Sequence, residues 1–176
     1  MFDEVVQIVN WEDQNVGIMA GADTMSSFLD ARMNNAATED QDPMAPFFFP
    51  KLLPSGPDLV FVLRIGERKY PVFVQSKFCN QDRLTPKIVN DALDTTLATN
   101  VSKHLEKSLD SYCPDGYYFS MLVTLPSEAA DVDPTKLERM DGLEPILMVL
   151  EKRNGKRLMG DDYDDLFEYM RTKSHK

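Results

Sequence analysis

Two runs of β-branched and aromatic residues follow one another within residues 56–77, separated by Gly66 and Glu67. Glycine tolerates a positive φ, so Gly66-Glu67 suits a tight turn between two strands. The pattern therefore predicts a β-hairpin, and Pro54-Ser55-Gly56-Pro57 forms a rigid turn that leads into it.

The segments before and after the hairpin show helical spacing of apolar residues. Residues 23–34 predict a helix capped by Asp23 or Thr24. A second, long helix is predicted to start at the N-cap Thr85 and to run to about Leu109, because apolar residues recur four apart. Asn100 is a candidate break in that helix.

Extended patterns return in the last third of the chain. Residues 117–125 and 145–151 predict buried strands. Asn154-Gly155 is a strong hairpin signal, with a return strand through residues 156–159, and a terminal helix follows Gly160. This order of elements predicts an α/β domain in which helices flank a sheet, with an α+β arrangement as the variant. Residues 1–20 fit either a short helix or an edge strand.

The length of 176 residues suits a single domain with its own core. We predict one domain over residues 1–176, with mobile segments at 1–20 and 34–46 and a frayed tail at 171–176. No apolar run approaches the length of a membrane span, so no membrane partner is expected. The acidic start of the chain lacks the basic region of a secretory signal.

The two cysteines, Cys79 and Cys113, form no CxxC motif. They predict buried thiols in a reducing, intracellular compartment rather than a disulfide framework or a zinc site.

The net charge of −10 argues against broad affinity for nucleic acid, since binding to the phosphate backbone depends on Lys and Arg. The charge is unevenly distributed: residues 1–50 carry −8, residues 51–107 carry +3 and residues 108–176 carry −5. DNA is therefore expected to approach through segment 51–107, although an excess of this size also arises by ordinary scatter. A protein partner is the alternative.

Three polar residues of the hairpin are predicted to converge at the end furthest from its turn. With a loop of two or four residues, the numbers of paired positions have the same sum as those of Ile65 and Arg68, and counting back places Asp58 opposite Gln75. Opposed residues share a face of the sheet, and Lys77 returns to that face two residues on. A three-residue loop would pair Asp58 with Ser76 and undo the convergence.

Pro57-Asp58, a hairpin, and then Gln75-Ser76-Lys77 resembles the motif of the PD-(D/E)xK nuclease superfamily, with Gln75 in place of an acid. The longer context is similar to the C-terminal region of fungal Crinkler-type proteins, which is restriction-endonuclease-like. That context comprises Phe47-Phe48-Phe49-Pro50, Gly56 to Phe61, Tyr70 to Lys77, Ala92-Leu93, Tyr112-Cys113-Pro114 and Tyr117 to Met121. The resemblance covers roughly residues 47–125.

The resemblance implies a restriction-endonuclease-like mixed sheet and a metal-dependent nuclease that cleaves DNA, as the toxic part of a Crinkler-like effector or a mobile-element protein. A nuclear or cytoplasmic location follows, including that of a secreted effector acting inside a host cell. Members of the superfamily have a further acid on the first helix, for which Asp23 and Glu12 are candidates by position.

The chemistry of the three residues fits this expectation in part. Asp58 and the side-chain oxygen of Gln75 are candidate ligands for Mg²⁺ or Mn²⁺, and Lys77 can orient water or stabilise charge on a phosphate. Because Gln75 is neutral, the site carries one negative charge fewer than the superfamily pattern. A catalytically degenerate domain that binds protein or nucleic acid is therefore the alternative, and an unrelated α/β interaction module, with Asp58 and Lys77 as an ordinary surface pair, is the second.

Overall fold

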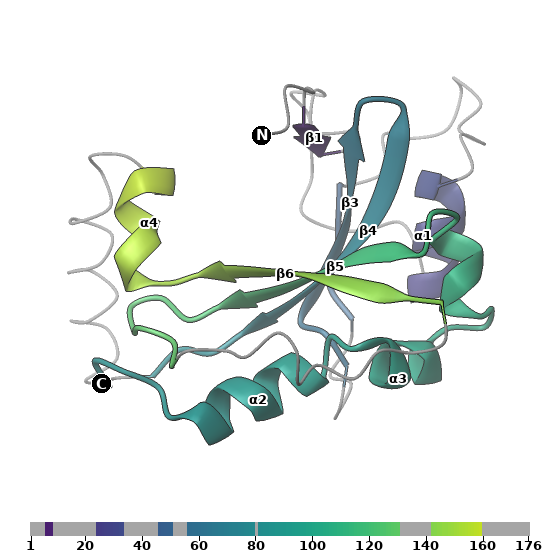
Figure 1. Ribbon diagram of the computed structural model, residues 1–176. Helices are drawn as coiled ribbons and strands as arrows, with labels where there is room; N and C mark the ends of the chain where they lie inside the picture. Colours follow the sequence, from purple (N-terminus) through teal and green to yellow (C-terminus); the bar gives the residue numbers. More distant parts are fainter. Residues whose placement is uncertain are drawn as a thin grey trace.

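The computed structural model of the protein describes residues 6–8, 24–33, 46–50, 56–79, 81–130 and 142–159. In this part of the chain a six-stranded mixed sheet is lined by helices (Figure 1). The strands are β1 (Val6–Ile8), β2 (Phe47–Phe48), β3 (Leu59–Ile65), β4 (Arg68–Ser76), β5 (Tyr117–Val123) and β6 (Glu144–Leu150). The helices are α1 (Met25–Met33), α2 (Pro86–Asp94), α3 (Ala98–Val101) and α4 (Lys152–Met159), with 3-10 turns η1 (Ser102–His104) and η2 (Leu109–Tyr112).

The strands lie in the order β1-β3-β4-β5-β6, and β2 also pairs with β3. Strands β1, β2 and β4 run antiparallel to β3, whereas β5 runs parallel to β4 and β6 runs parallel to β5. The C-terminal ends of β4, β5 and β6 therefore lie side by side at the same end of the strands, which is the carboxyl edge of the sheet, and β3 begins at that edge. The predicted α/β domain with a central mixed sheet and flanking helices is confirmed.

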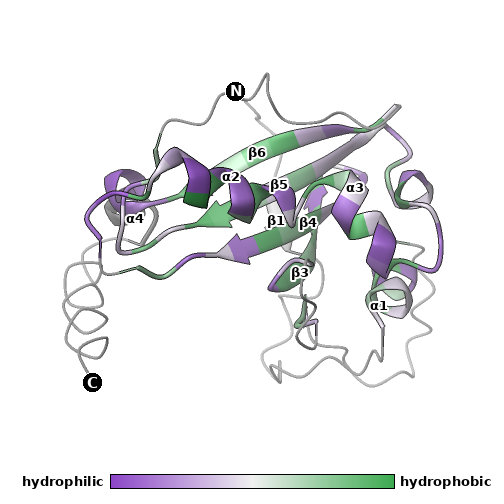
Figure 2. Ribbon diagram, turned by 90° about the horizontal axis from the view of Figure 1, so that it is seen from below, coloured by the Kyte–Doolittle hydropathy of each residue, from purple (hydrophilic) through white to green (hydrophobic). Residues whose placement is uncertain are grey.

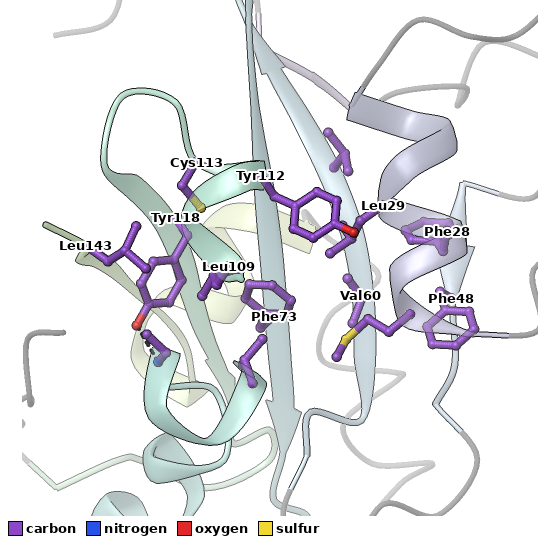
Figure 3. Packing of buried hydrophobic residues seen from close by; sticks show 14 residues of the cluster. Phe28, Leu29, Phe48, Val60, Phe73, Leu109, Tyr112, Cys113, Tyr118 and Leu143 are labelled. Atoms are coloured by element: carbon purple, nitrogen blue, oxygen red, sulfur yellow. Dashed lines mark hydrogen bonds between the residues drawn. The ribbon is translucent and has the colours of Figure 1, made fainter. Parts of the chain in front are cut away.

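One face of the sheet is covered by α1, α2, α3 and η2. Alternate side chains of β3, β4 and β5, such as Val60, Phe73 and Tyr118, pack with α1, α3 and η2 in one buried cluster (Figure 3). Within it the rings of Phe28 and Phe48 stack with their centroids 5.5 Å apart. A second cluster joins α2 to β5 and to the segment that follows β5.

The intervening side chains form the opposite face of the sheet. Phe61, Val72, Val74 and Phe119 are buried there in a third cluster, which among the described residues draws only on strands. Figure 2 shows β5 and β6 coloured largely as hydrophobic, while α2 alternates between hydrophilic and hydrophobic residues. This alternation is the pattern of a helix that buries one side against a sheet.

The N-terminal elements answer two questions that the sequence left open. Strand β1 pairs with β3 at one edge of the sheet, so the described part of residues 1–20 is an edge strand and not a helix. Helix α1 is capped by Thr24, whose side-chain oxygen accepts a hydrogen bond from the Ser27 N–H (3.1 Å). Residues 9–23, 34–45, 131–141 and 160–176 lie outside the described residues. They hold most of the two predicted mobile segments and all of the terminal helix and frayed tail.

The long helix predicted after Thr85 is wrong beyond Asp94. Thr85 does cap α2, and its side chain accepts from the N–H of Ile88. The helix then ends in hydrogen bonds that span three residues, such as the one from the Thr96 N–H to the carbonyl of Leu93 (2.8 Å). The hydroxyls of Thr95 and Thr96 lie within hydrogen-bond distance of the carbonyls three residues back, and such side-chain contacts compete with the helical pattern.

Asn100 is not the break in this helical region, because it lies inside α3. Its Nδ2 donates to the carbonyl of Asp94 (2.6 Å), the last residue of α2. Asn100 therefore satisfies a helix-end carbonyl across the break instead of causing it.

The hairpin predicted at Asn154-Gly155 is also wrong, because these residues lie within α4. Asn154 accepts from the N–H of Glu151 (2.8 Å) and donates to the carbonyl of Val149 (2.6 Å). The Gly155 N–H donates to the carbonyl of Glu151 (2.7 Å), which is a helical contact. The asparagine side chain thus ties the start of the helix to the end of β6 and overrides the turn signal.

Candidate functional site

The site is built at the open end of the β3–β4 hairpin. Ile65 pairs with Arg68 across the two-residue turn Gly66-Glu67, and Gly66 has a φ of 59°. The ladder continues to Leu59 and Val74, and the Asp58 N–H donates to the carbonyl of Val74 (2.8 Å). The short-turn register is therefore confirmed, and Asp58 lies beside Gln75 at the edge where β3 begins.

Asp58 is exposed, but one of its carboxylate oxygens is held firmly. Oδ2 accepts hydrogen bonds from Gln75 Nε2 (2.6 Å) and from the Ser76 N–H (2.7 Å). No hydrogen bond reaches Oδ1 from the described part of the chain. The carboxylate is thus oriented by one oxygen and open to a ligand through the other.

Gln75 is buried, with 5% of its surface exposed, and both ends of its amide are engaged. Nε2 faces Asp58 and also lies 3.3 Å from the carbonyl of Ser76. Oε1 accepts from the hydroxyl of Thr95 (2.6 Å), the C-cap residue of α2. Since an ionised carboxylate only accepts hydrogen bonds, the nitrogen of the amide must be the end that faces Asp58.

Lys77 follows β4 directly and continues the line of the strand. Its N–H donates to the carbonyl of Val123 (2.8 Å), and strand alternation puts its side chain on the face that Gln75 occupies. The side chain is half-buried, and it makes no hydrogen bond or ion pair with other described residues. No ion pair with a described residue would therefore have to break for its ammonium group to meet an anion.

Thr95 and Glu151 complete this edge of the sheet, and the sequence pointed to neither. Glu151 directly follows β6 and is buried at 6% exposure. Its Oε2 accepts from the Ala129 N–H and its Oε1 from Arg153 Nε, both at 2.6 Å. The paired threonines at the end of α2 were the available signal for Thr95, because such residues bond back to helix carbonyls. For Glu151 the only signal was an acid at a strand end.

The donor set for a divalent cation fits only in part. Among the described residues, no three His, Cys, Asp or Glu side chains come together in a way that could hold a metal. Asp58 offers an open carboxylate oxygen, whereas Gln75 turns its nitrogen and not its oxygen toward that carboxylate. The residues fit Mg²⁺ through Asp58 and water, and through Gln75 once its amide turns over. Asp23 and Glu12 lie outside the described residues.

The basic segment 51–107 is partly neutralised by carboxylates. Arg68 pairs with Asp115 (3.2 Å), Lys87 with Asp91 (2.5 Å) and Lys107 with Asp30 (2.7 Å). Two of these three acids come from the acidic segments on either side of it. Its charge excess in sequence therefore overstates the positive field that a polyanion meets, and Lys77 is the cation beside the candidate site.

Both cysteines are free, as predicted, but only one of the two predicted buried thiols is buried, because Cys79 is half-buried. Cys113 is buried, and burial raises the pKa of its thiol to about 12. A thiol that stays protonated is a poor nucleophile and a poor metal ligand, so Cys113 is part of the core. Burial likewise raises the pKa of Tyr118 to about 12, and its hydroxyl accepts from the Ala98 N–H at 2.9 Å.

No family model, curated protein or solved structure matches the chain. The likeness to PD-(D/E)xK nucleases and to Crinkler-type proteins therefore stays a prediction from the sequence. No helix within the described ranges is long and apolar enough to cross a membrane.

Proposed function

We propose that the domain is a divalent-cation-dependent nuclease that hydrolyses phosphodiester bonds in DNA. One observation carries the proposal: the hairpin register brings Asp58 against Gln75 and starts Lys77 on the same face, two residues further on. In open α/β sheets, ligands bind beyond the carboxyl ends of the strands, and this site lies at that edge.

Each residue has a distinct role in this proposal. Asp58 would hold the cation, and the Ser76 N–H keeps its carboxylate in place through Oδ2. The cation supplies a polarised water and charge compensation at the phosphate. Lys77 contributes a positive charge for the scissile phosphate that no described acid neutralises.

Two further features support a nucleic-acid substrate in a reducing compartment. Phe78 follows Lys77 and is 63% exposed, so it offers an aromatic surface on which a base can stack. Cys79 and Cys113 are free thiols, as is usual inside cells. A role as the active part of an effector that works within a host cell is consistent with both features.

A second candidate function is a degenerate nuclease-like domain that binds protein or nucleic acid without cleaving it. The specific observation in its favour is the Asp58–Gln75 hydrogen bond, in which a neutral amide and not a second acid stands beside the carboxylate. A second carboxylate at position 75 would repel Asp58 unless a cation lay between them, whereas the amide removes that need.

The first experiment is a calorimetric titration of Mg²⁺ and Mn²⁺ into the wild type, Asp58→Ala and Asp110→Ala, with plasmid cleavage measured on the same samples. Asp110 is an exposed aspartate outside the site and serves as the matched control. We expect cation binding and nicking to disappear together in Asp58→Ala and to persist in Asp110→Ala. Binding without nicking in the wild type would favour the degenerate domain. If neither appears at millimolar cation, the nuclease proposal is wrong.

A further inference from the structure

The far end of the Gln75 amide is held by a residue outside the hairpin. Thr95 Oγ1 lies 2.6 Å from Gln75 Oε1, and it belongs to the C-cap of α2. We infer that Thr95 is a positioning residue whose hydroxyl determines which end of the Gln75 amide faces Asp58. The part of this inference that concerns a cation depends on the proposed function, and the part that concerns the cation-free protein does not.

Two acceptors lie within hydrogen-bond distance of the Thr95 hydroxyl. Besides Gln75 Oε1, the carbonyl of Ala92 lies 2.7 Å from Oγ1. A hydroxyl carries one proton and can accept through its lone pairs. The Ala92 carbonyl also receives the backbone N–H of Thr95, so it keeps a partner when the hydroxyl turns to Gln75.

These contacts define one self-consistent arrangement of the site. The hydroxyl donates to Oε1, and Nε2 donates to the Asp58 carboxylate at 2.6 Å. Both ends of a buried amide are then satisfied, and leaving either end unpaired would carry a desolvation cost. The opposite arrangement would bring Oε1 against Asp58 Oδ2, and two oxygens that only accept hydrogen bonds repel each other at that separation.

A cation beside Asp58 reverses this preference. When the amide makes a half turn, its oxygen faces the cation and Nε2 faces Thr95. The hydroxyl then accepts from Nε2 and donates its proton to the Ala92 carbonyl. Thr95 can therefore pair with Gln75 in both orientations, which makes Gln75 a donor to Asp58 without a cation and an oxygen ligand with one.

The test follows the side-chain amide signals of Gln75 by NMR in the full chain labelled with ¹⁵N-glutamine. Gln75→Leu assigns the signals. Thr95→Val removes the hydroxyl at similar volume, and Thr95→Ser restores it. Thr85→Val removes a hydroxyl from the other end of α2 and controls for loss of helix stability.

In the cation-free protein we expect the Gln75 amide protons to exchange with water about fivefold faster in Thr95→Val, the effect of losing one hydrogen bond of average strength. Thr95→Ser should restore wild-type exchange, and Thr85→Val should not alter the Gln75 signals. Unchanged Gln75 signals in a folded Thr95→Val protein would overturn the inference. If that variant does not fold, Thr95→Ala takes its place.

Addition of Mg²⁺ separates this inference from the proposed function. We expect the Gln75 signals of the wild type and of Thr95→Ser to shift with the affinity that calorimetry gives. Cation binding that leaves these signals in place would refute the amide turn, while the nuclease proposal would stand. If Mg²⁺ does not bind but Thr95→Val still alters the Gln75 signals, the nuclease proposal fails and the positioning role of Thr95 stands.

Discussion

Two carboxylates lie at the same edge of the sheet in opposite situations. Asp58 precedes β3 and is exposed, with hydrogen bonds from described residues to only one oxygen. Glu151 follows β6 and is buried, with one partner on each oxygen. The Glu151 carboxylate joins the end of β6 to the segment after β5, through the Ala129 N–H.

The difference shows how to separate a structural acid from a functional one at a strand end. Glu151 has used both oxygens on the protein, so a ligand would have to displace a hydrogen bond within a buried site. Asp58 is oriented by the protein through one oxygen, and its other oxygen accepts no hydrogen bond from the described residues. Position at the carboxyl edge of a sheet is therefore not sufficient, and the number of occupied oxygens discriminates between the two acids.

The largest effect on stability is expected for Glu151→Ala. This change leaves the buried Ala129 N–H without its partner, so the free energy of unfolding should fall by about 2–3 kcal/mol. The exposed guanidinium of Arg153 adds little to that figure. Urea denaturation measures the loss. Asp58→Ala should cost only about 1 kcal/mol, because Gln75 Nε2 keeps the carbonyl of Ser76 (3.3 Å) as a partner. An equal loss in both variants would mean that the number of occupied oxygens does not distinguish the two acids.

A smaller loss is expected for Gln75→Glu, which gives Asp58 an acidic neighbour in place of the amide. Without a cation the two carboxylates repel, and the free energy of unfolding should fall by about 2 kcal/mol at pH 8. At pH 5 the loss should be smaller, because a shared proton relieves the repulsion, and stability then decreases as the pH rises.

Mg²⁺ provides the control for this variant. Mg²⁺ that binds to the folded state should restore the stability of Gln75→Glu. Mg²⁺ should also bind to this variant about tenfold more tightly than to the wild type. Urea denaturation at both pH values, with and without Mg²⁺, tests both expectations. A variant as stable as the wild type in the absence of Mg²⁺ would mean that the residue at position 75 does not face Asp58.

The hairpin and the pairing of Asp58 with Gln75 could be predicted because they depend on local information. Gly66 permits the two-residue turn, and the period of two then fixes every partner along the strands. The same reasoning placed Lys77 on the face of Gln75. These predictions needed no knowledge of distant parts of the chain.

The features that sequence reasoning missed depend on contacts between distant segments. Apolar spacing of four is compatible with a continuous helix, and Thr95 ends α2 where its hydroxyl also reaches Gln75, 20 residues away. Asn154 resembles a turn residue until its side chain meets the end of β6. The orientation of the Gln75 amide follows from two partners on different elements, and a sequence pattern does not record such a choice.

The smallest effect on stability is expected for Lys77→Met, which should change the free energy of unfolding by less than about 0.5 kcal/mol. The variant keeps the apolar stem and removes a charge without a described partner.

If Lys77 contacts a phosphate, DNA binding should weaken and the slope of log K against log salt should fall by about 1. Lys77→Arg should keep the slope, and Lys87→Met, which removes a cation already paired with Asp91, is the matched control. Fluorescence anisotropy over a salt series measures all four proteins. Equal slopes in Lys77→Met and the wild type would exclude Lys77 from the nucleic-acid contact. Asp58 would then act without Lys77 as a cationic partner in binding.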